Sequence, residues 1–311
     1  MTKKSNDHGG GLDGAARQYG GNRTDWIDLS TGINPLPYGV SGIQPDAWTA
    51  LPDQTAATNL TDAARAFWNV PDTAAILAAP GASSLIANMP RLAPTASVDI
   101  TGPTYNEHAS AFEVAGWKTD GAAAAQVVVH PNNPDGRIWS IDQIKAPLRI
   151  IDESFCDVMP LQSLIQHAAE PGTIVLKSFG KFWGLAGLRL GFAIGEPALI
   201  EQLKTMLGPW PVSGPALTIG AQALRDHDWA NQTRMRLEKD AAKLDQLITA
   251  KGATVVGGTT LFRLYDVGDA AEWQDRLAQS QIWSRIFPYS TRWLRLGLPH
   301  PMDWSSIEDA L

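Results

Sequence analysis

The sequence lacks several features that would assign it to a special class. It has one cysteine, Cys156, in 311 residues, which excludes an internal disulfide and a cysteine-rich metal site. No apolar run approaches the roughly 18 residues of a membrane-spanning helix, and the opening MTKKSNDHGGG lacks the apolar core of a secretory signal. The formal net charge is −7 and there is no basic block, which argues against a nucleic-acid partner. We therefore expect a cytoplasmic protein with no membrane or nucleic-acid partner.

The remaining composition, 44% hydrophobic and 18% charged, is that of an ordinary globular protein. Short apolar runs alternate with helical patterns, which predicts an α/β fold with a mainly parallel sheet covered by helices. The predicted strands of this sheet are 97–100, 126–130, 148–151, 173–176 and 190–194. A helical pattern covers 55–70, and a turn followed by a helix is predicted from Pro80.

We expect three regions along the chain. Residues 1–40 are rich in glycine and polar residues and read as an extended arm that joins the small domain. Residues 41–214 form the large domain, and 215–311 form a long helix, over about 215–250, and a smaller α+β domain. The predicted elements of that small domain are strands at 253–256, 261–265, 281–287 and 293–296 and a helix near 270–278.

The stretch 174–195, IVLKSFGKFWGLAGLRLGFAIG, contains the most informative residues. Lys181 lies between glycines and apolar residues, where desolvation makes an amine a usable nucleophile for Schiff-base chemistry. Ser178 offers a hydroxyl and Arg189 a fork of donors, which together suit a phosphate. A lysine beside a phosphate cradle suggests pyridoxal phosphate. A buried strand followed by a polar turn is an equally good explanation of this stretch alone.

Other candidate ligands follow predicted strands, where open α/β sheets bind ligands. Each of them also has a purely structural explanation, as a helix cap, a packed aromatic or a plain turn. They are an anion site at Gly81, Ala82, Ser83 and Ser84; an aromatic that could stack on a flat ring, Tyr105; a donor to a phenolate oxygen, Asn133; and a carboxylate that could pair with a pyridinium N–H, Asp152.

The order and spacing of these pieces resemble the aspartate-aminotransferase-like enzymes of fold type I, which use pyridoxal phosphate. The resemblance covers nearly the whole chain and implies a large domain with a mainly parallel, mixed sheet and a smaller α+β domain. It implies that Lys181 bonds to the cofactor, that Asp152 pairs with the ring nitrogen, that Asn133 contacts the ring oxygen and that Tyr105 stacks on the ring. The phosphate would be held by the 81–84 turn, Ser178 and Arg189.

The ends of the chain narrow the resemblance. His8-Gly9-Gly10, the segment LSTGINPLP at 29–37 and RIFPYSTRWLRLGLP at 285–299 are similar to the cobalamin-pathway threonine-phosphate decarboxylases. This implies a homodimer that decarboxylates L-threonine O-3-phosphate to (R)-1-amino-2-propanol O-2-phosphate. The implied substrate residues are Arg285 for the phosphate and Arg295 for the carboxylate, with His8, Gly9, Gly32 and Asn133 completing the pocket. Two arginines on neighbouring strands also suit a doubly anionic amino acid on chemical grounds.

Two departures from the pattern affect the assignment. Phe155 occupies a position where the broader class has a tyrosine against the ring oxygen, and Leu51 replaces a tyrosine that reaches the partner's cofactor phosphate. The alternatives are a histidinol-phosphate aminotransferase on the same fold and a non-catalytic protein that keeps the cofactor pocket. Serine phosphate also stays open as a substrate, because one methyl group gives only about 1–3 kcal/mol of discrimination.

Overall fold

A computed structural model describes residues 8–311 of the chain, and these fall into two compact units. The large unit is 37–232, and the small unit consists of the residues up to 36 together with 233–311. Residues 37–40 and 215–232 thus belong to the large unit, whereas the sequence assigned them to the arm and to the small domain. None of the helices among residues 8–311 combines the length and the apolar character needed to cross a bilayer.

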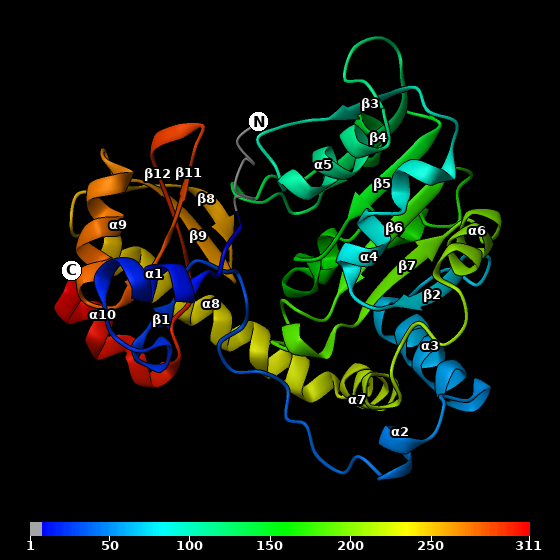
Figure 1. Ribbon diagram of the computed structural model, residues 1–311, viewed down its shortest axis with the longest axis horizontal. Coiled ribbons are helices and arrows are strands. Elements are labelled where there is room, and N and C mark those ends of the chain that lie inside the picture. The colour runs from blue at the N-terminus through cyan, green and yellow to red at the C-terminus, as the bar shows by residue number, and fades with distance from the viewer. Residues whose placement is uncertain (1–7) are drawn as a thin grey trace. The chain divides into compact units, whose positions relative to one another are not determined.

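A six-stranded sheet of strand order β2-β7-β6-β5-β4-β3 forms the centre of the large unit (Figure 1). Strands β3, β4, β5 and β6 run parallel, and β7 runs against both of its neighbours. The strands are β2 Ala75–Ala79, β3 Ser97–Ile100, β4 Ala123–Val129, β5 Leu148–Asp152, β6 Thr173–Ser178 and β7 Gly191–Gly195. The predicted α/β class with a mixed, mainly parallel sheet is confirmed, and β2, whose alanine-rich sequence gives a weak strand signal, was missed.

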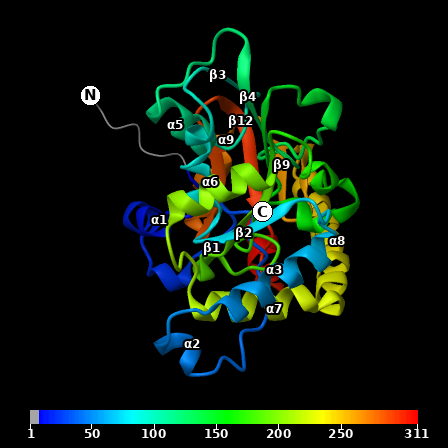
Figure 2. The same ribbon diagram turned by 90° about the vertical axis from the view of Figure 1, so that its right-hand side faces the viewer.

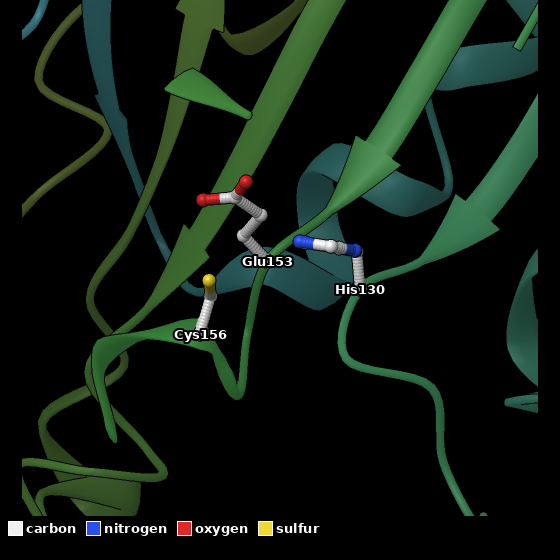
Figure 3. A group of neighbouring side chains, drawn as sticks. All are labelled: His130, Glu153 and Cys156. Carbon is white, nitrogen blue, oxygen red and sulfur yellow. The ribbon is translucent and has the colours of Figure 1, made fainter. Parts of the chain in front are cut away.

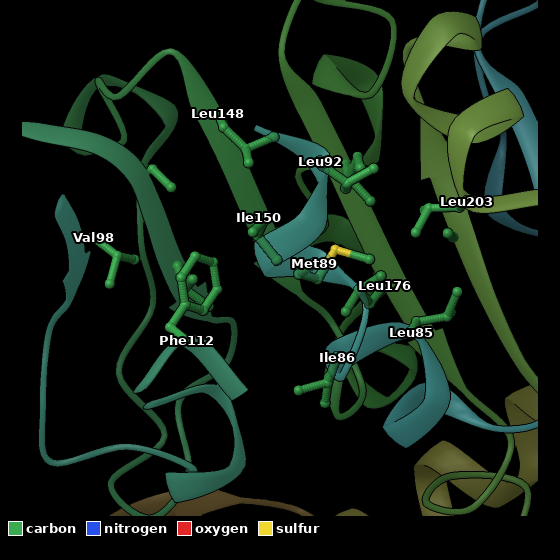
Figure 4. Packing of buried hydrophobic residues seen from close by; sticks show 14 of the residues in the cluster. Leu85, Ile86, Met89, Leu92, Val98, Phe112, Leu148, Ile150, Leu176 and Leu203 are labelled. Carbon is green, nitrogen blue, oxygen red and sulfur yellow. The ribbon is translucent and has the colours of Figure 1, made fainter. Parts of the chain in front are cut away.

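Helices cover both faces of this sheet. On one face, apolar side chains of α4, α5 and α6 pack with strand residues such as Ile150 and Leu176 (Figure 4). On the other, α3 and α7 lie side by side (Figures 1 and 2). The helices are α2 Asp46–Thr49, α3 Gln54–Trp68, α4 Ala82–Ile86, α5 Asn106–Val114, α6 Pro197–Leu207 and α7 Gly214–Arg225. Since successive strand residues point to opposite faces, Leu176 and Lys177 of β6 face different helices.

The long helix expected over 215–250 is two helices, α7 and α8 His227–Thr249, because Asp226 interrupts it. Asp226 leaves the helical conformation, and its carboxylate accepts a hydrogen bond from the backbone N–H of Trp229 at 2.9 Å. An aspartate in this position caps the helix that follows it. The helix expected from Pro80 is likewise shorter, since α4 ends at Ile86 and a 3-10 turn follows at Met89–Leu92.

The small unit contains a four-stranded antiparallel sheet in the order β11-β12-β9-β8. Within the arm that was expected to be extended, one segment forms helix α1, and the glycines on either side of it hid this amphipathic pattern. The strand expected over 281–287 is two strands that pair separately, β10 with β1 and β11 with β12. The elements are α1 Leu12–Tyr19, β1 Ile27–Asp28, β8 Thr254–Thr259, β9 Phe262–Asp266, α9 Ala270–Gln279, β10 Ile282–Trp283, β11 Arg285–Phe287, β12 Ser290–Gly297 and α10 Trp304–Ala310.

Candidate active site

The carboxyl ends of the parallel strands gather candidate residues at one edge of the large sheet. Asp152 ends β5 and lies opposite Val129 of β4 on one side and Leu176 of β6 on the other. Asn133 follows β4, and Ser178 ends β6. Ligand sites of open α/β sheets lie at this edge, because the loops that leave the strands meet there. The topology therefore brings together residues that the sequence separates by tens of positions.

Asp152 is 2% exposed and accepts three hydrogen bonds. One of its oxygens accepts a hydrogen bond from His108 Nε2 at 2.8 Å, and the other accepts from the Ser154 amide at 2.9 Å and hydroxyl at 2.5 Å. Burial alone would raise the pKa of Asp152, but His108 and Ser154 together lower it below its ordinary value. A buried carboxylate held in the ionised form can pair with a cationic N–H group.

His108 is a site residue that the sequence did not reveal. It lies in the first turn of α5, is fully buried, and reaches the Asp152 carboxylate 44 positions further along the chain. Ile150 packs among the side chains of α4, α5 and α6, and Asp152, two residues later on the same strand, faces the same way. A histidine three residues after the candidate aromatic Tyr105 was the available signal, and the Tyr105 ring lies edge-on to the His108 ring with centroids 6.1 Å apart.

Lys181 is half-buried on a turn that is anchored by aromatic residues on both sides. Phe179, Phe182 and Trp183 are completely buried. The Trp183 ring stacks on Trp229 with centroids 5.3 Å apart. These rings hold the backbone on each side of Lys181, whose ammonium group lies 5.3 Å from the centre of the Phe155 ring. The turn therefore presents one amine beside the ring that replaces the expected tyrosine.

Lys177 lies four positions before Lys181 and has a different environment. Its ammonium group is fully buried and forms an ion pair with Glu153 at 2.6 Å, with Asp157 at 3.6 Å. Burial alone would lower the pKa of Lys177, but the charges of Glu153 and Asp157 raise it above its ordinary value. An ammonium group held in this way is not a nucleophile. The environment of Lys177 therefore excludes it as the reactive amine.

The turn at Gly81 and the guanidinium of Arg189 form a cradle for an anion. Gly81 has a φ of 86°, and a Cβ there would lie 2.7 Å from Arg189 Nη2, so a larger residue would displace the arginine. Gly191 pairs with Ala79 on one side and with Ser178 on the other, which places all three at the same level of the sheet. A Cβ at Gly191 would also meet the Ala82 amide at 2.5 Å. Backbone N–H groups, a hydroxyl and a guanidinium therefore converge here.

The other predicted residues of the large unit differ in how far they are buried. Ser84 is half-buried and donates its hydroxyl to the Gly81 carbonyl at 2.8 Å, whereas Ser83 is exposed. Asn133 is half-buried on the loop after β4, and Leu51 is 68% exposed. The structure thus places the turn at 81–84 beside Arg189 and Asn133 on the same sheet edge as Asp152.

Arg285 and Arg295 lie in the small unit and are direct cross-strand partners on β11 and β12. Side chains of such a pair share one face of a sheet. Arg295 is 4% exposed, and its Nη2 donates to the carbonyl of Ser30. The Ser30 hydroxyl in turn accepts from the Gly10 amide at 2.6 Å, and a Cβ at Gly9 would meet the Ser30 carbonyl oxygen. The two glycines at 9–10 are therefore packed against Ser30, the residue that Arg295 binds.

The remaining predicted substrate residues also lie in the small unit. Gly32 is buried two residues after Ser30, and His8 is exposed immediately before Gly9. The small unit thus brings the two arginines and the glycine-rich arm into one region, whereas Asn133 belongs to the large unit.

A buried group of potential metal ligands, His130, Glu153 and Cys156, lies beneath the sheet edge (Figure 3). His130 Nδ1 accepts from the Trp139 amide at 3.0 Å, so Nε2 carries the proton and donates to the Gln162 carbonyl at 2.6 Å. Glu153 already pairs with the Lys177 ammonium. Burial lowers the pKa of His130 and raises that of the Cys156 thiol. Both ring nitrogens of His130 bond backbone groups and the Glu153 carboxylate pairs with Lys177, so these contacts account for the group without a metal ion.

Comparison with known proteins identifies the class of this chain. The family model for aminotransferases of class I and II matches residues 25–303, and the chain belongs to this family. Within it, the chain is 41% identical to a threonine-phosphate decarboxylase of a Sinorhizobium species, over 98% of this chain and 97% of the relative. It is 38% identical to the threonine-phosphate decarboxylase of Pseudomonas aeruginosa over the same shares. The family resemblance predicted from the sequence is therefore confirmed.

A solved structure supports the fold. Histidinol-phosphate aminotransferase from Sinorhizobium meliloti, in complex with pyridoxal-5'-phosphate, superposes with a TM-score of 0.79 at 18% identity. The match covers 97% of this chain and 93% of the other. At this identity the likeness concerns the fold, and it agrees with the predicted fold type I architecture.

Proposed function

We propose that this protein is a pyridoxal-phosphate-dependent decarboxylase that converts L-threonine O-3-phosphate to (R)-1-amino-2-propanol O-2-phosphate and carbon dioxide, a step of cobalamin biosynthesis. The observation that carries the proposal is the 41% identity to a threonine-phosphate decarboxylase over 98% of the chain. The residues at the sheet edge have the chemistry that this reaction needs. We further propose that the enzyme acts in the cytoplasm.

The large unit fits pyridoxal phosphate at both ends of that molecule. The ionised Asp152 suits the ring nitrogen, and the cradle of Gly81, Ala82, Ser178 and Arg189 suits the phosphate, with Ser83 and Ser84 on the same turn. Lys181 would bond to the cofactor, Tyr105 would stack on its ring and Asn133 would contact the ring oxygen. When bound, pyridoxal phosphate supplies an electron sink for the pair left at Cα as carbon dioxide departs.

In this proposal the residues of the chain position the substrate and move one proton. Arg295 holds the carboxylate and Arg285 the phosphate, because each anion needs a cation once water is excluded. His8, Gly9, Gly32 and Asn133 are the other residues that we propose for substrate binding. After carbon dioxide has left, Lys181 Nζ donates a proton to Cα. Phe155 lies beside the Lys181 ammonium group and cannot form the hydrogen bond that a tyrosine hydroxyl would make there.

We also propose that the active protein is a homodimer. Three apolar side chains of the large unit support a subunit contact: Trp48 and Leu51 are each 68% exposed and Trp210 is 58% exposed. Light scattering after size exclusion tests this, because one chain has a mass of 33.5 kDa. Full activity in a particle of that mass would contradict the proposal.

Product analysis tests the function most directly. The purified protein is loaded with pyridoxal phosphate and incubated with L-threonine O-3-phosphate, and carbon dioxide and the phosphorylated amino alcohol are measured. Serine phosphate is the parallel substrate, and histidinol phosphate with 2-oxoglutarate tests the aminotransferase activity of the related enzymes. Turnover of histidinol phosphate without carbon dioxide release from threonine phosphate would overturn the assignment.

A further inference from the structure

Asn132 joins two loops at the site edge that the sheet itself does not join. The ladder between β3 and β4 ends at the pair Ile100–Val127, and the loops continue beyond it. Asn132 Oδ1 accepts from the Thr104 hydroxyl at 2.6 Å, and its Nδ2 donates to the Pro103 carbonyl at 3.0 Å. The side chain therefore ties the loop after β4 to the loop after β3.

The oxygen and both N–H groups of the Asn132 side chain form hydrogen bonds. Its second Nδ2 hydrogen goes to the Asp135 carboxylate at 2.7 Å, its backbone amide donates to Arg137 and its carbonyl accepts from Gly136. The residue is 1% exposed. One acceptor and two donors on a short planar group are needed together, and only a carboxamide supplies them. An aspartate here would place a second carboxylate against Asp135.

Residues on both sides of this connection are assigned to the cofactor. On the β4 side, Asn133 is the next residue after Asn132. On the β3 side, Thr104 is followed by Tyr105, the N-cap residue of helix α5, and α5 carries His108 to its 2.8 Å contact with Asp152. The ring-oxygen contact, the stacking residue and the ring-nitrogen carboxylate therefore depend on the alignment of the same two loops.

We infer that Asn132 is a positioning residue that aligns Tyr105, Asn133 and the His108–Asp152 pair around the cofactor ring. The inference rests on the proposed assignment of the cofactor contacts. It assigns to Asn132 no contact with substrate or cofactor. If Asn132 only stabilised the fold, its replacement would leave the electronic state of the bound cofactor unchanged. A change in that state therefore distinguishes a positioning role from a purely structural one.

Gln126 provides a matched control on the same strand. It is also a buried carboxamide, 8% exposed, and it also makes one accepted and two donated side-chain bonds, from Lys145 and to Asp99 and Gln143. It lies in the interior of β4 rather than at the site edge. The substitutions Asn132→Leu and Gln126→Leu therefore both remove the hydrogen bonds of a buried carboxamide. Asn132→Leu also breaks the link between the two loops, and Gln126→Leu leaves that link in place.

The experiment titrates the visible absorption band of each holoenzyme with pH and measures the pyridoxal phosphate retained after dialysis. For Asn132→Leu we expect the midpoint of the titration to move by up to about one pH unit, because the free energy of one hydrogen bond corresponds to a pKa change of about that size. We also expect cofactor to dissociate about tenfold more readily. Gln126→Leu should lower the melting temperature but keep the wild-type midpoint and retention.

A milder pair keeps the test decisive if Asn132→Leu folds poorly. Thr104→Val removes one bond to Asn132, and Thr104→Ser retains the hydroxyl. A shifted midpoint in Thr104→Val that is restored in Thr104→Ser supports the inference. Wild-type midpoints and retention in Asn132→Leu and Thr104→Val, or equal shifts in Gln126→Leu, overturn it while leaving the proposed function intact. A wild-type protein without a visible band would overturn both.

Discussion

The contact between His108 and Asp152 leads to a prediction whose sign and size can be worked out. His108→Leu keeps a side chain of similar volume and removes the donor 2.8 Å from the Asp152 carboxylate. A hydrogen bond to a charged group contributes about 1.5–3 kcal/mol. At 1.36 kcal/mol per unit, its loss should raise the pKa of Asp152 by about one to two units. The two bonds from Ser154 remain and keep the shift from being larger.

The pH dependence follows from the direction of the Asp152 shift. The folded-state pKa of this carboxyl is lowered, so its stabilising contribution is present above the unfolded-state pKa. That contribution is lost as the pH falls through the folded-state pKa. His108→Leu raises the folded-state pKa of Asp152 and so removes part of its contribution to the free energy of unfolding at neutral pH. Once the pH is low enough for Asp152 to be protonated in both proteins, this difference between them disappears. The stability deficit of the variant should therefore shrink as the pH is lowered from about 6 to below about 4.

Urea unfolding of wild type and His108→Leu across this pH range measures the deficit, and cofactor retention at neutral pH is measured alongside. His108→Gln, which keeps a donor, should recover part of the loss. Ser154→Ala should show a smaller deficit of the same sign, because the Ser154 backbone amide still bonds Asp152. A deficit that does not change with pH would refute the reasoning, since it would mean that His108 does not stabilise an ionised carboxylate.

Four further substitutions separate the proposed roles. Lys181→Ala should abolish the visible band of the lysine-bound cofactor, and peptide mapping after borohydride reduction should locate the label on Lys181 in wild type; a label on Lys177 would contradict the assignment. Lys177→Met leaves Glu153 buried without its cation and should cost about 3–5 kcal/mol of folding stability, measured by urea unfolding, while the band persists in the folded fraction. Arg285→Ala should lower kcat/KM for threonine phosphate by the equivalent of about 2–5 kcal/mol with normal cofactor content, and wild-type kinetics would remove the support for a phosphorylated substrate. Arg295→Ala should impair turnover of every amino acid tested, phosphorylated or not, and a defect limited to phosphorylated substrates would reverse the two assignments.

The elements predicted well from the sequence are those whose burial leaves a direct pattern. The strands 148–152 and 173–178 are buried on both faces, so nearly continuous apolar runs marked them. The strand Ala75–Ala79 escaped because alanine has little preference for strands. Helix α1 escaped because glycines flank it, and Tyr19 at its end packs against Trp26, seven residues further on, and against the distant Trp283.

The site shows the same division between local and distant information. Asp152 was predictable because a carboxylate at the end of an apolar strand is visible in the sequence, and so was the cluster Ser178, Lys181 and Arg189. His108 was not, because a histidine three residues after Tyr105 does not by itself show that it faces a carboxylate 44 residues away. Asn132 was not distinguished from its neighbour Asn133, because the bonds that identify it come from a loop after another strand.

Lys177 of β6 and Lys181 of the turn after it show why the spacing of residues in the sequence does not identify a site by itself. Lys177 and Lys181 lie four residues apart in one apolar, glycine-containing segment, so the local sequence predicts partial burial of both. The alternation of β6 turns Lys177 away from Leu176 and toward Trp68 of α3, where Glu153 and Asp157 hold its charge. Lys181 comes after the strand has ended, and buried rings on either side fix it beside Phe155. The Glu153 and Asp157 carboxylates come from the segment after β5 and pair with the Lys177 ammonium group, so residues outside the lysine segment make Lys177 a structural residue.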